Sequence, residues 1–375
     1  MKQAPEVVSA DPASFPWSVF HRRHPVLIEQ VIGALPRPTT QRAALDALLA
    51  ESVSGVLTAP ERPWPWWRPH YAGLRWTDVP FLWAESYFYR RLLDAVEYFA
   101  PGPWRGIDPF GPIKAADLAG TAVDDELAAL DDLAGRPLEE QRTALVASSL
   151  WGNRADLSFE AGAPTAGSGG GLLADDSALL WSTPDTGSVH LIADNAGREL
   201  LPDLILLDHL LVTGRARDVV LHVKPHPYYV SDATPFDVLS GARRLSAAPG
   251  IASDAGARLA EAIRNGTLTI RAHEFFCAPL PYPAMPPDLR AELAGADLVI
   301  VKGDLNYRRL VEDRHWPATT PFAELTEDFP APLVALRTLK CDVVVGLSEP
   351  TLAKLDAGGE PWRTTGAYAV IQGRP

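Results

Sequence analysis

Acids, amides and cations follow four short apolar runs in the second half of the chain, at the point where each run ends. Asp194 and Asn195 follow VHLIA, and Lys224 and Asp232 follow VVLHV. Two later runs, DLVIV and PLVAL, are followed by Lys302, Asp304, Asn306, Tyr307, Arg308, Arg337, Thr338 and Lys340. Because ligands bind beyond the carboxyl ends of the strands in an open parallel sheet, we expect these side chains to share one site.

The residue types at these strand ends favour a metal ion next to a bound anion. Asp194, Asn195 and Asp232 offer hard oxygen ligands, which suit Mg²⁺ or Mn²⁺. The cations that could bind the anion are Lys302, Arg308, Arg337 and Lys340. A metal ion beside fixed cations suits phosphoryl transfer, because negative charge on the phosphoryl oxygens must be neutralised. The hypothesis is therefore a metal-dependent phosphatase that acts on a small phosphomonoester.

Each of these features also has a purely structural interpretation. Asp194 and Asp232 each precede a predicted helical segment, so each could be a helix N-cap. Gly303 could serve a strand-to-helix turn, since glycine adopts backbone angles that other residues avoid. Arg337 and Lys340 could be solvated charges at the edge of the sheet. The placement of all of them at successive strand ends favours a shared site.

Other kinds of site find little support in the sequence. His222 and His226 are four residues apart, but Pro225 and Pro227 prevent the helix that would turn both toward a zinc ion. The glycine-rich segment 161–171 precedes no Lys-Ser or Lys-Thr pair, so a linker or a lid is expected there rather than a phosphate-binding loop. No G-x-S-x-G motif follows a predicted strand, which disfavours a serine hydrolase.

The pattern of apolar residues predicts the elements that position these side chains. Strands are expected at 189–194, 219–224, 268–272, 297–303, 332–338 and 341–346, with helices at 198–212, 255–265, 288–294 and 305–312. This alternation predicts a three-layer α/β/α sandwich around a Rossmann-like, mostly parallel sheet. Earlier helices are expected at 25–35, 40–53, 81–99, 124–134 and 138–150. We expect a helical N-terminal domain over residues 1–135 and an α/β domain over residues 136–375.

Composition disfavours several classes of protein. The chain carries 47 acidic and 34 basic residues, a net charge of −13, whereas a nucleic-acid binder usually presents a basic patch. No apolar run approaches the roughly 20 residues that span a bilayer, and the N-terminus lacks the apolar core of a signal peptide. Cys277 and Cys341 suggest neither a disulfide framework nor a metal knuckle. We expect a cytoplasmic protein with no nucleic-acid or membrane partner.

Several ordered segments resemble the damage-control phosphatase family. The matching segments are WGNRADLS (151–158), ADNAGREL (193–200), KPHPYYVSD (224–232), VKGDLNYR (301–308) and RTLK (337–340). The Arg-Thr-x-Lys sequence is typical of the acidic-residue-methyltransferase-like subfamily, and WAESYFYRRL (83–92) is similar to the helical region of that subfamily. The resemblance is strong over residues 151–345 and looser over residues 17–120.

This resemblance implies a helical domain on an α/β/α sandwich and a divalent metal ion held by Asp194, Asn195 and Asp232. Mn²⁺ is the expected ion, with Co²⁺, Ni²⁺ and Mg²⁺ as alternatives. Asp194, Asn195 and Lys340 are the expected catalytic residues. The other expected substrate contacts are Asp304, Leu305, Asn306, Tyr307, Arg308 and Arg337, with Glu199, Asn153 and Asp156 close by. The implied substrate is a small phosphorylated metabolite, and fructose 1-phosphate and fructose 6-phosphate are the first candidates.

Two mechanisms and two other activities stay open at the level of sequence. Asp194 could attack phosphorus and form an aspartyl-phosphate, or it could remain a metal ligand while metal-bound water attacks. The name of the subfamily records a competing activity, S-adenosylmethionine-dependent methylation of protein carboxylates, but no glycine-rich strand–helix turn of the usual methyltransferase kind is visible. A non-catalytic protein that binds sugar phosphates would use the same ligands.

Overall fold

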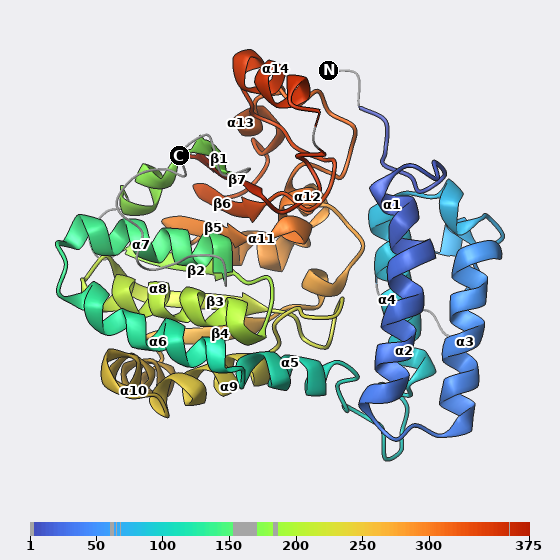
Figure 1. Ribbon diagram of the computed structural model, residues 1–375, viewed down its shortest axis with the longest axis horizontal. Helices are drawn as coiled ribbons and strands as arrows, with labels where there is room; N and C mark the ends of the chain where they lie inside the picture. The colour runs from blue at the N-terminus through green and yellow to red at the C-terminus, as the bar shows by residue number, and fades with distance from the viewer. Residues whose placement is uncertain are drawn as a thin grey trace.

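The fold is an α/β arrangement beside a group of N-terminal helices (Figure 1). The computed structural model describes residues 4–60, 64, 66–67, 69–152, 171–182, 187–359 and 361–375. Its α-helices are α1 (Phe15–Ser18), α2 (His24–Ala34), α3 (Thr39–Ser54), α4 (Phe81–Ala95), α5 (Gly111–Leu118), α6 (Thr121–Ala134), α7 (Leu138–Trp151), α8 (Leu200–Val212), α9 (Pro235–Ser246), α10 (Gly250–Asn265), α11 (Pro287–Leu293), α12 (Asp304–Leu310), α13 (Phe322–Leu325) and α14 (Glu349–Ala357).

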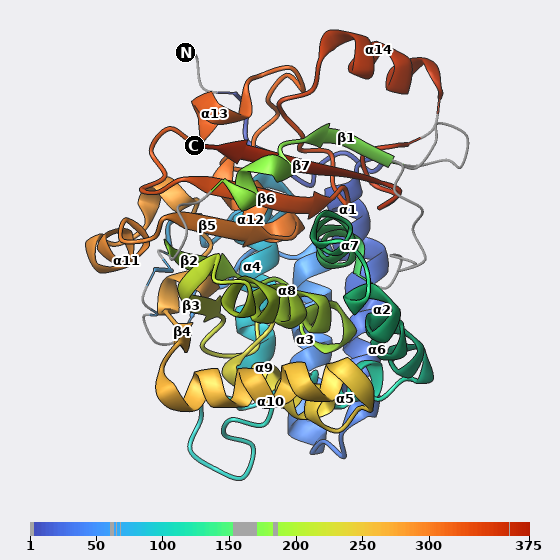
Figure 2. The same ribbon diagram turned by 90° about the vertical axis from the view of Figure 1, so that its left-hand side faces the viewer.

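The central sheet is mostly parallel. Its strands are β1 (Gly171–Asp175), β2 (Gly187–Ile192), β3 (Ala216–Val223), β4 (Leu268–Ala272), β5 (Leu298–Lys302), β6 (Leu333–Thr338) and β7 (Tyr368–Arg374). They lie in the order β1-β7-β6-β5-β2-β3-β4, which can be followed from top to bottom in Figure 2. Only the pairing of β6 with β7 is antiparallel among the described strands.

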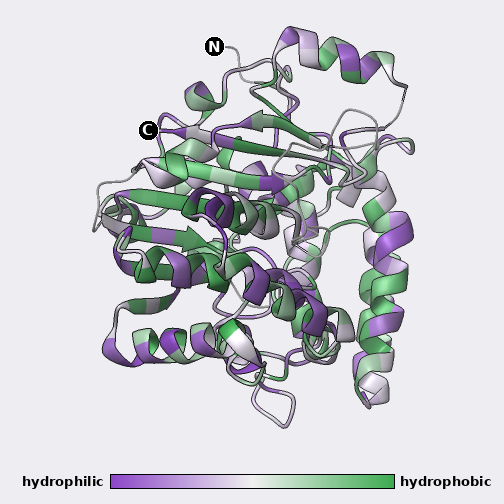
Figure 3. Ribbon diagram, turned by 60° about the vertical axis from the view of Figure 1, so that its left-hand side comes forward, coloured by the Kyte–Doolittle hydropathy of each residue, from purple (hydrophilic) through white to green (hydrophobic). Residues whose placement is uncertain are grey.

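Alternate residues of the central strands enter two different cores. Leu298 and Ile300 of β5 pack with the apolar faces of α6 to α10. Val299 and Val301 pack on the opposite face, in a core that includes α11, α12 and the N-terminal helices. Because successive side chains of a strand point to opposite faces, a run such as LVIV needs helices on both sides. Figure 3 shows these strands as largely hydrophobic, which confirms the predicted α/β fold.

Helix α4 joins the N-terminal helices to the sheet. All of its residues from Phe81 to Tyr89 are buried. Its Glu85 carboxylate accepts a hydrogen bond of 3.0 Å from Arg308 of α12, and its Ser86 hydroxyl accepts one of 2.6 Å from Tyr228. Helix α6 instead packs against α7 and α10. The predicted domain boundary at residue 135 stays a prediction. Within the described residues, no helix is long and apolar enough to cross a membrane.

The strand predicted at 341–346 is wrong. These residues bend at positions 341 and 342 and join no sheet, and β6 pairs instead with β7, which the apolar pattern did not reveal. Strand β1 was also not predicted. Side chains satisfy the backbone of this segment: Arg337 donates to the carbonyl oxygen of Val343, the Val345 N–H donates to the Tyr307 hydroxyl, and Gln372 donates to the Val345 carbonyl oxygen. Buried backbone groups need partners, but these need not belong to a strand.

Gln372 offers a test of this packing. The side chain is buried, donates to Val345 at 2.8 Å and accepts from the Tyr307 hydroxyl at 2.7 Å. Gln372→Ala leaves both partners without a hydrogen bond, so we expect the free energy of unfolding to fall by about 2–4 kcal/mol. Urea denaturation measures this change. Arg264→Gln, which removes an exposed ion pair on α10, is the control and should change stability by less than about 0.5 kcal/mol. Equal effects of the two variants would contradict this account.

Candidate functional site

The candidate site lies where the strand order reverses. The chain places β3 and β4 on one side of β2, and then crosses to place β5 and β6 on the other side. The connections that follow β2 and β5 therefore leave in opposite directions, and this opens a crevice beyond the carboxyl ends of these two strands. Asp194 and Asn195 follow β2, while Gly303 and Asp304 follow β5. The crevice thus receives the side chains that the sequence singled out.

Backbone pairing brings Asp232 next to Asp194. The segment after β3 pairs with the segment after β2: the N–H of Ala233 donates to the carbonyl oxygen of Asp194 at 2.8 Å, and the N–H of Ala196 donates to that of Ser231 at 2.6 Å. The Ser231 hydroxyl also donates to Asn195 Oδ1 at 2.7 Å. Asp194, Asn195 and Asp232 are therefore held together, as the sequence predicted.

The pKa of each of the two carboxyl groups is raised. Burial is the largest cause and the neighbouring Asp232 carboxylate the next, and together they raise the pKa of Asp194 to about 8. Burial likewise raises the pKa of Asp232 to about 6, although Lys224 opposes the shift. Lys224 Nζ lies 3.4 Å from Asp232 Oδ2, which accepts no closer hydrogen bond from the described residues. A second cation next to this pair would lower the cost of burying both charges.

Two cavities meet at these residues. The first cavity, of about 350 Å³, lies beside β2, β5 and β6. The second cavity, of about 520 Å³, lies between the strand ends and helices α1, α2 and α4. Both are lined by Asp194, Asn195, Lys340 and Arg23. A ligand that touches these four residues could therefore extend into either cavity.

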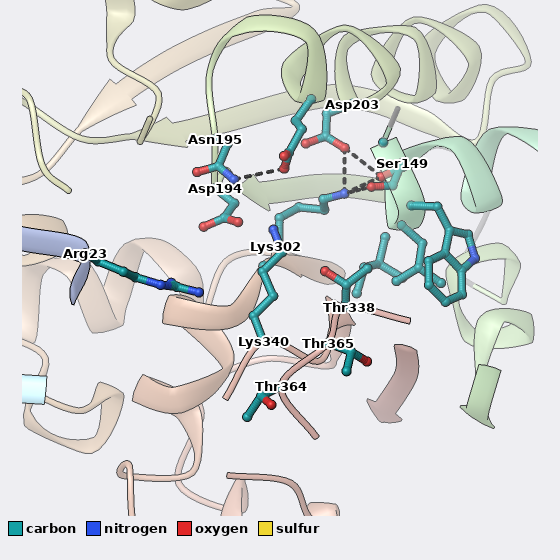
Figure 4. Close-up of a pocket in the computed structure, with 17 residues that line it drawn as sticks. Arg23, Ser149, Asp194, Asn195, Asp203, Lys302, Thr338, Lys340, Thr364 and Thr365 are labelled. Atoms are coloured by element: carbon teal, nitrogen blue, oxygen red, sulfur yellow. Dashed lines mark hydrogen bonds and ion pairs between the residues drawn. The ribbon is translucent and has the colours of Figure 1, made fainter. Parts of the chain in front are cut away.

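Lys340 carries a cation into this junction. The side chain is exposed to the cavities, and Figure 4 shows its ammonium group pointing toward Asp194. Its positive charge lowers the pKa of that carboxyl and partly offsets the effects of burial and of Asp232. Lys302 is arranged differently, because its ammonium donates to the Ser149 hydroxyl at 2.8 Å and lies 2.9 Å from Asp203 Oδ1 (Figure 4). Of these two lysines, Lys340 is the one whose charge faces the junction.

Both predicted arginines form ion pairs with carboxylates near the site. Arg337 is fully buried, and its Nε donates to Asp304 Oδ1 at 2.9 Å while its remaining donors reach Val343 and Cys341. Burial would raise the pKa of Asp304, but Arg337 and further cations hold it below its usual value. The guanidinium of Arg308 lines the second cavity and is bound by Glu85 and Asp313. The structure places Arg337 behind Asp304 rather than on a cavity wall.

The residues between Asp304 and Arg308 divide into two groups. Asp304 and Leu305 line the second cavity. Asn306 is buried and donates to the carbonyl oxygens of Ala193 at 3.0 Å and Lys302 at 2.8 Å, so it ties the ends of β2 and β5 together. Tyr307 is buried among protein atoms, with its hydroxyl bound to Gln372. Asn306 and Tyr307 therefore line neither of the two cavities, although the resemblance implied substrate contacts for both.

Glu199 lies beside the metal-site candidates, as predicted. It lines the first cavity, and its Oε2 accepts a hydrogen bond of 2.9 Å from Asn195 Nδ2. Asn153, Asp156 and most of the glycine-rich segment 161–171 lie outside the described residues, so their predicted roles stay predictions.

Several cavity residues had no signal in the sequence. Arg23, Ser149, Asp203, Thr364 and Thr365 all line the first cavity but come from segments far from the predicted strand ends. Asp203 and Lys302 form a buried ion pair although they are far apart in the sequence, so no local spacing could predict it.

The donor set fits a divalent ion of the hard type. Asp194, Asn195 and Asp232 supply two carboxylates and an amide oxygen, and Gly303 leaves room beside the Asp194 carboxylate where any Cβ would collide. No group of three or more His, Cys, Asp or Glu side chains with metal-site geometry occurs in the described part of the chain. A metal site here would therefore need the amide of Asn195.

Comparison with known proteins identifies the family. The profile of the damage-control phosphatase ARMT1-like domain matches residues 19–355. The chain belongs to this family. It is 35% identical to the damage-control phosphatase ARMT1 of Danio rerio over 332 residues, which cover 79% of this chain and 74% of that protein. It is 34% identical to the damage-control phosphatase ARMT1 of Homo sapiens over 333 residues, or 80% and 75% of the two chains.

A solved structure supports the fold of this family member. A DUF89 family protein from Pyrococcus horikoshii superposes with a TM-score of 0.51 at 15% sequence identity, covering 95% of this chain and 97% of the other. At this level of identity the likeness concerns the fold alone.

Gly303 tests the geometry of the site in this damage-control phosphatase family member. A Cβ at Gly303 would lie 1.9 Å from Asp194 Oδ2, and the backbone φ of +86° is unfavourable for other residues. Gly266 has a similar φ of +83° but open space around it. We expect Gly266→Ala to lower the free energy of unfolding by about 1 kcal/mol. Gly303→Ala should lower it clearly more in urea denaturation, and equal losses would mean that the Asp194 carboxylate is not packed as described.

The raised pKa of Asp194 predicts how the metal-free protein responds to pH. In the folded state Asp194 keeps its proton up to about pH 8, whereas an unfolded aspartate loses it near pH ~4. The folded state thus binds more protons in this interval, so stability should fall as the pH rises from about 4 to about 8. Urea midpoints in the presence of a chelator measure this. Asp194→Asn should flatten the dependence, and an unchanged slope in that variant would refute the assignment.

Proposed function

We propose that this protein is a metal-dependent phosphatase that hydrolyses small phosphomonoesters. The observation that carries the proposal is the pair Asp194 and Asp232, which backbone pairing holds together near the positive charge of Lys340, in a crevice at the reversal of strand order. Membership of the damage-control phosphatase family supports the reaction class. Fructose 1-phosphate and fructose 6-phosphate are the substrates that we propose to test first.

The proposed metal ligands are Asp194, Asn195 and Asp232, with Mn²⁺ as the first ion to test and Co²⁺, Ni²⁺ and Mg²⁺ as alternatives. When bound, a divalent ion would neutralise charge on the phosphoryl oxygens. The chain already orients these ligands. The Asn195 amide accepts a hydrogen bond from Ser231 at its oxygen and donates one to Glu199 from its nitrogen. These two bonds fix the orientation of the amide. This pre-orientation favours metal binding because little side-chain freedom is left to lose.

The substrate would bind at the junction of the two cavities. Lys340 lines both cavities and would hold a phosphoryl oxygen, so its charge would stabilise negative charge that develops there. The cavity volumes, about 350 and 520 Å³, suit a small ligand. Asp304, Leu305 and Arg308 line the second cavity and would contact the part of the substrate that extends into it. Arg337 would act indirectly, because it holds Asp304.

Removal of metal and of its proposed ligands tests the function. Chelator-treated protein should release no phosphate from p-nitrophenyl phosphate or fructose 1-phosphate, and added Mn²⁺ should restore release. Asp194→Asn and Asp232→Asn should each lower turnover by about a hundredfold or more, since each removes a charge next to the reacting group. Asp288→Asn, which alters a carboxylate that is 74% exposed on α11, is the matched control and should keep normal activity.

The outcomes separate the competing functions. Release of phosphate that survives both chelation and Asp194→Asn would show that the proposed site is wrong. Retained binding of metal and sugar phosphate without release would instead indicate a binding protein. Methyl transfer from labelled S-adenosylmethionine to protein carboxylates, without phosphate release, would indicate the methyltransferase.

A further inference from the structure

We propose that Arg23 binds the phosphoryl group of the substrate, as a second cation that the N-terminal helices place opposite Lys340. The inference rests on the proposed function and deepens it, because it assigns a substrate contact to a part of the chain outside the α/β sheet. Arg23 is the last residue of η1 (Val19–Arg23), a π-helical turn between α1 and α2.

The position of Arg23 singles it out among the N-terminal residues. Of the described residues that line the first cavity, it is the only one that precedes Ser149 in the chain. It also lines the second cavity. Figure 4 shows its side chain reaching from the N-terminal helix toward the region between Asp194 and Lys340. A ligand at the junction of the cavities would therefore meet Arg23 on one side and Lys340 on the other.

The guanidinium of Arg23 has no ionic partner among the described residues. It lies over the Phe15 ring, 4.9 Å from the ring centre, which leaves its N–H donors free. Two other arginines near the site are engaged, since Arg308 binds Glu85 and Asp313 and Arg337 binds Asp304. Arg22 lies over the Trp17 ring and lines the second cavity but not the first. Arg23 and Lys340 are thus the cations shared by both cavities in the described part of the chain, and neither is neutralised by an ion pair.

The fold holds this part of the helix firmly. His24, the next residue, is buried, and its ring stacks on that of Phe88 in α4 with 3.6 Å between ring centres. Burial lowers the pKa of His24 to about 3, so this ring adds no charge of its own. Pro25 lacks the N–H that an α-helix needs, and its ring would crowd the carbonyl group of His21. The chain widens here into a π turn, in which the His24 N–H donates to Val19.

The chemistry of arginine suits the proposed contact. Its planar guanidinium can donate two parallel hydrogen bonds to a phosphoryl group, whereas a lysine acts as a point charge. Three carboxyl groups, those of Asp194, Asp232 and Glu199, line the two cavities, and a bound divalent ion would hold Asp194 in its charged form. A dianionic phosphate entering the site would be repelled by these carboxylates unless fixed cations lie close by. Arg23 supplies such a charge from the side of the site formed by the N-terminal helices.

Binding of inorganic phosphate tests the inference without requiring turnover. Isothermal titration calorimetry on the full chain loaded with Mn²⁺ would compare wild type, Arg23→Gln, Arg23→Lys and Arg42→Gln. Arg42 is an exposed arginine of α3 that lines neither cavity and is the matched control for net charge. We expect Arg23→Gln to raise the Kd for phosphate about tenfold or more, because a charge-assisted hydrogen bond is lost. Arg23→Lys should recover part of this loss, and Arg42→Gln should bind as wild type does.

Two further measurements separate a substrate contact from a structural role. The Kd for Mn²⁺ and the circular dichroism spectrum should be unchanged in Arg23→Gln, and the KM for fructose 1-phosphate should rise. A phosphate Kd within twofold of wild type, or a loss equal to that of Arg42→Gln, would overturn the inference.

The failure of this inference can be distinguished from failure of the proposed function. If wild type hydrolyses sugar phosphates and Arg23→Gln binds phosphate normally, the inference fails and the function stands. If wild type releases no phosphate but Arg23→Gln still weakens phosphate binding, the anion contact stands and the proposed function fails. If wild type binds no phosphate at all, both are overturned.

Discussion

The close placement of two aspartates, the buried Asp232 and the partly buried Asp194, is the constraint on which the rest of the site depends. Asp194 lies just beyond β2 and Asp232 lies in the segment that follows β3, and backbone pairing around Ala233 leaves them little freedom to separate. Their raised pKa values express the energetic cost of this arrangement. Proteins keep such costly pairs where function requires them, and a divalent cation is the natural partner for them. Lys224 and Lys340 offset only part of the charge.

Much of the cationic charge near the site maintains the structure. Arg337 fixes Asp304 and the segment around Val343, and Arg308 ties α12 to Glu85 of α4. A buried guanidinium must be hydrogen-bonded along its whole edge, and the residues that satisfy it are then locked in place. The cations that remain for a ligand come from the rim of the crevice. One follows β6 and the other comes from the N-terminal helices, so both parts of the chain line the proposed ligand site.

The sequence predicted the fold correctly where continuous apolar runs marked the strands. Strands buried on both faces, such as β2 and β5, must be nearly continuous apolar runs, and these runs also located the strand ends that carry Asp194 and Asp304. The same rule failed for residues 341–346, although Cys341, Val343, Val344 and Val345 are equally apolar and buried. There the backbone groups form hydrogen bonds with the side chains of Tyr307, Gln372 and Arg337. The local sequence cannot predict partners that come from elsewhere in the chain.

The sequence by itself therefore determined the α/β fold, the edge of the sheet that carries the site and the residue types gathered there. Only the tertiary structure decided which charges face the cavities. Lys302, Arg337 and Lys340 look alike in sequence, yet the first two are bound by Asp203 and Asp304, whereas Lys340 reaches the junction. The physical reason is that burial and ion pairing depend on neighbours distant in the chain. For the same reason, the place of Arg23 opposite Lys340 emerged only from the packed structure.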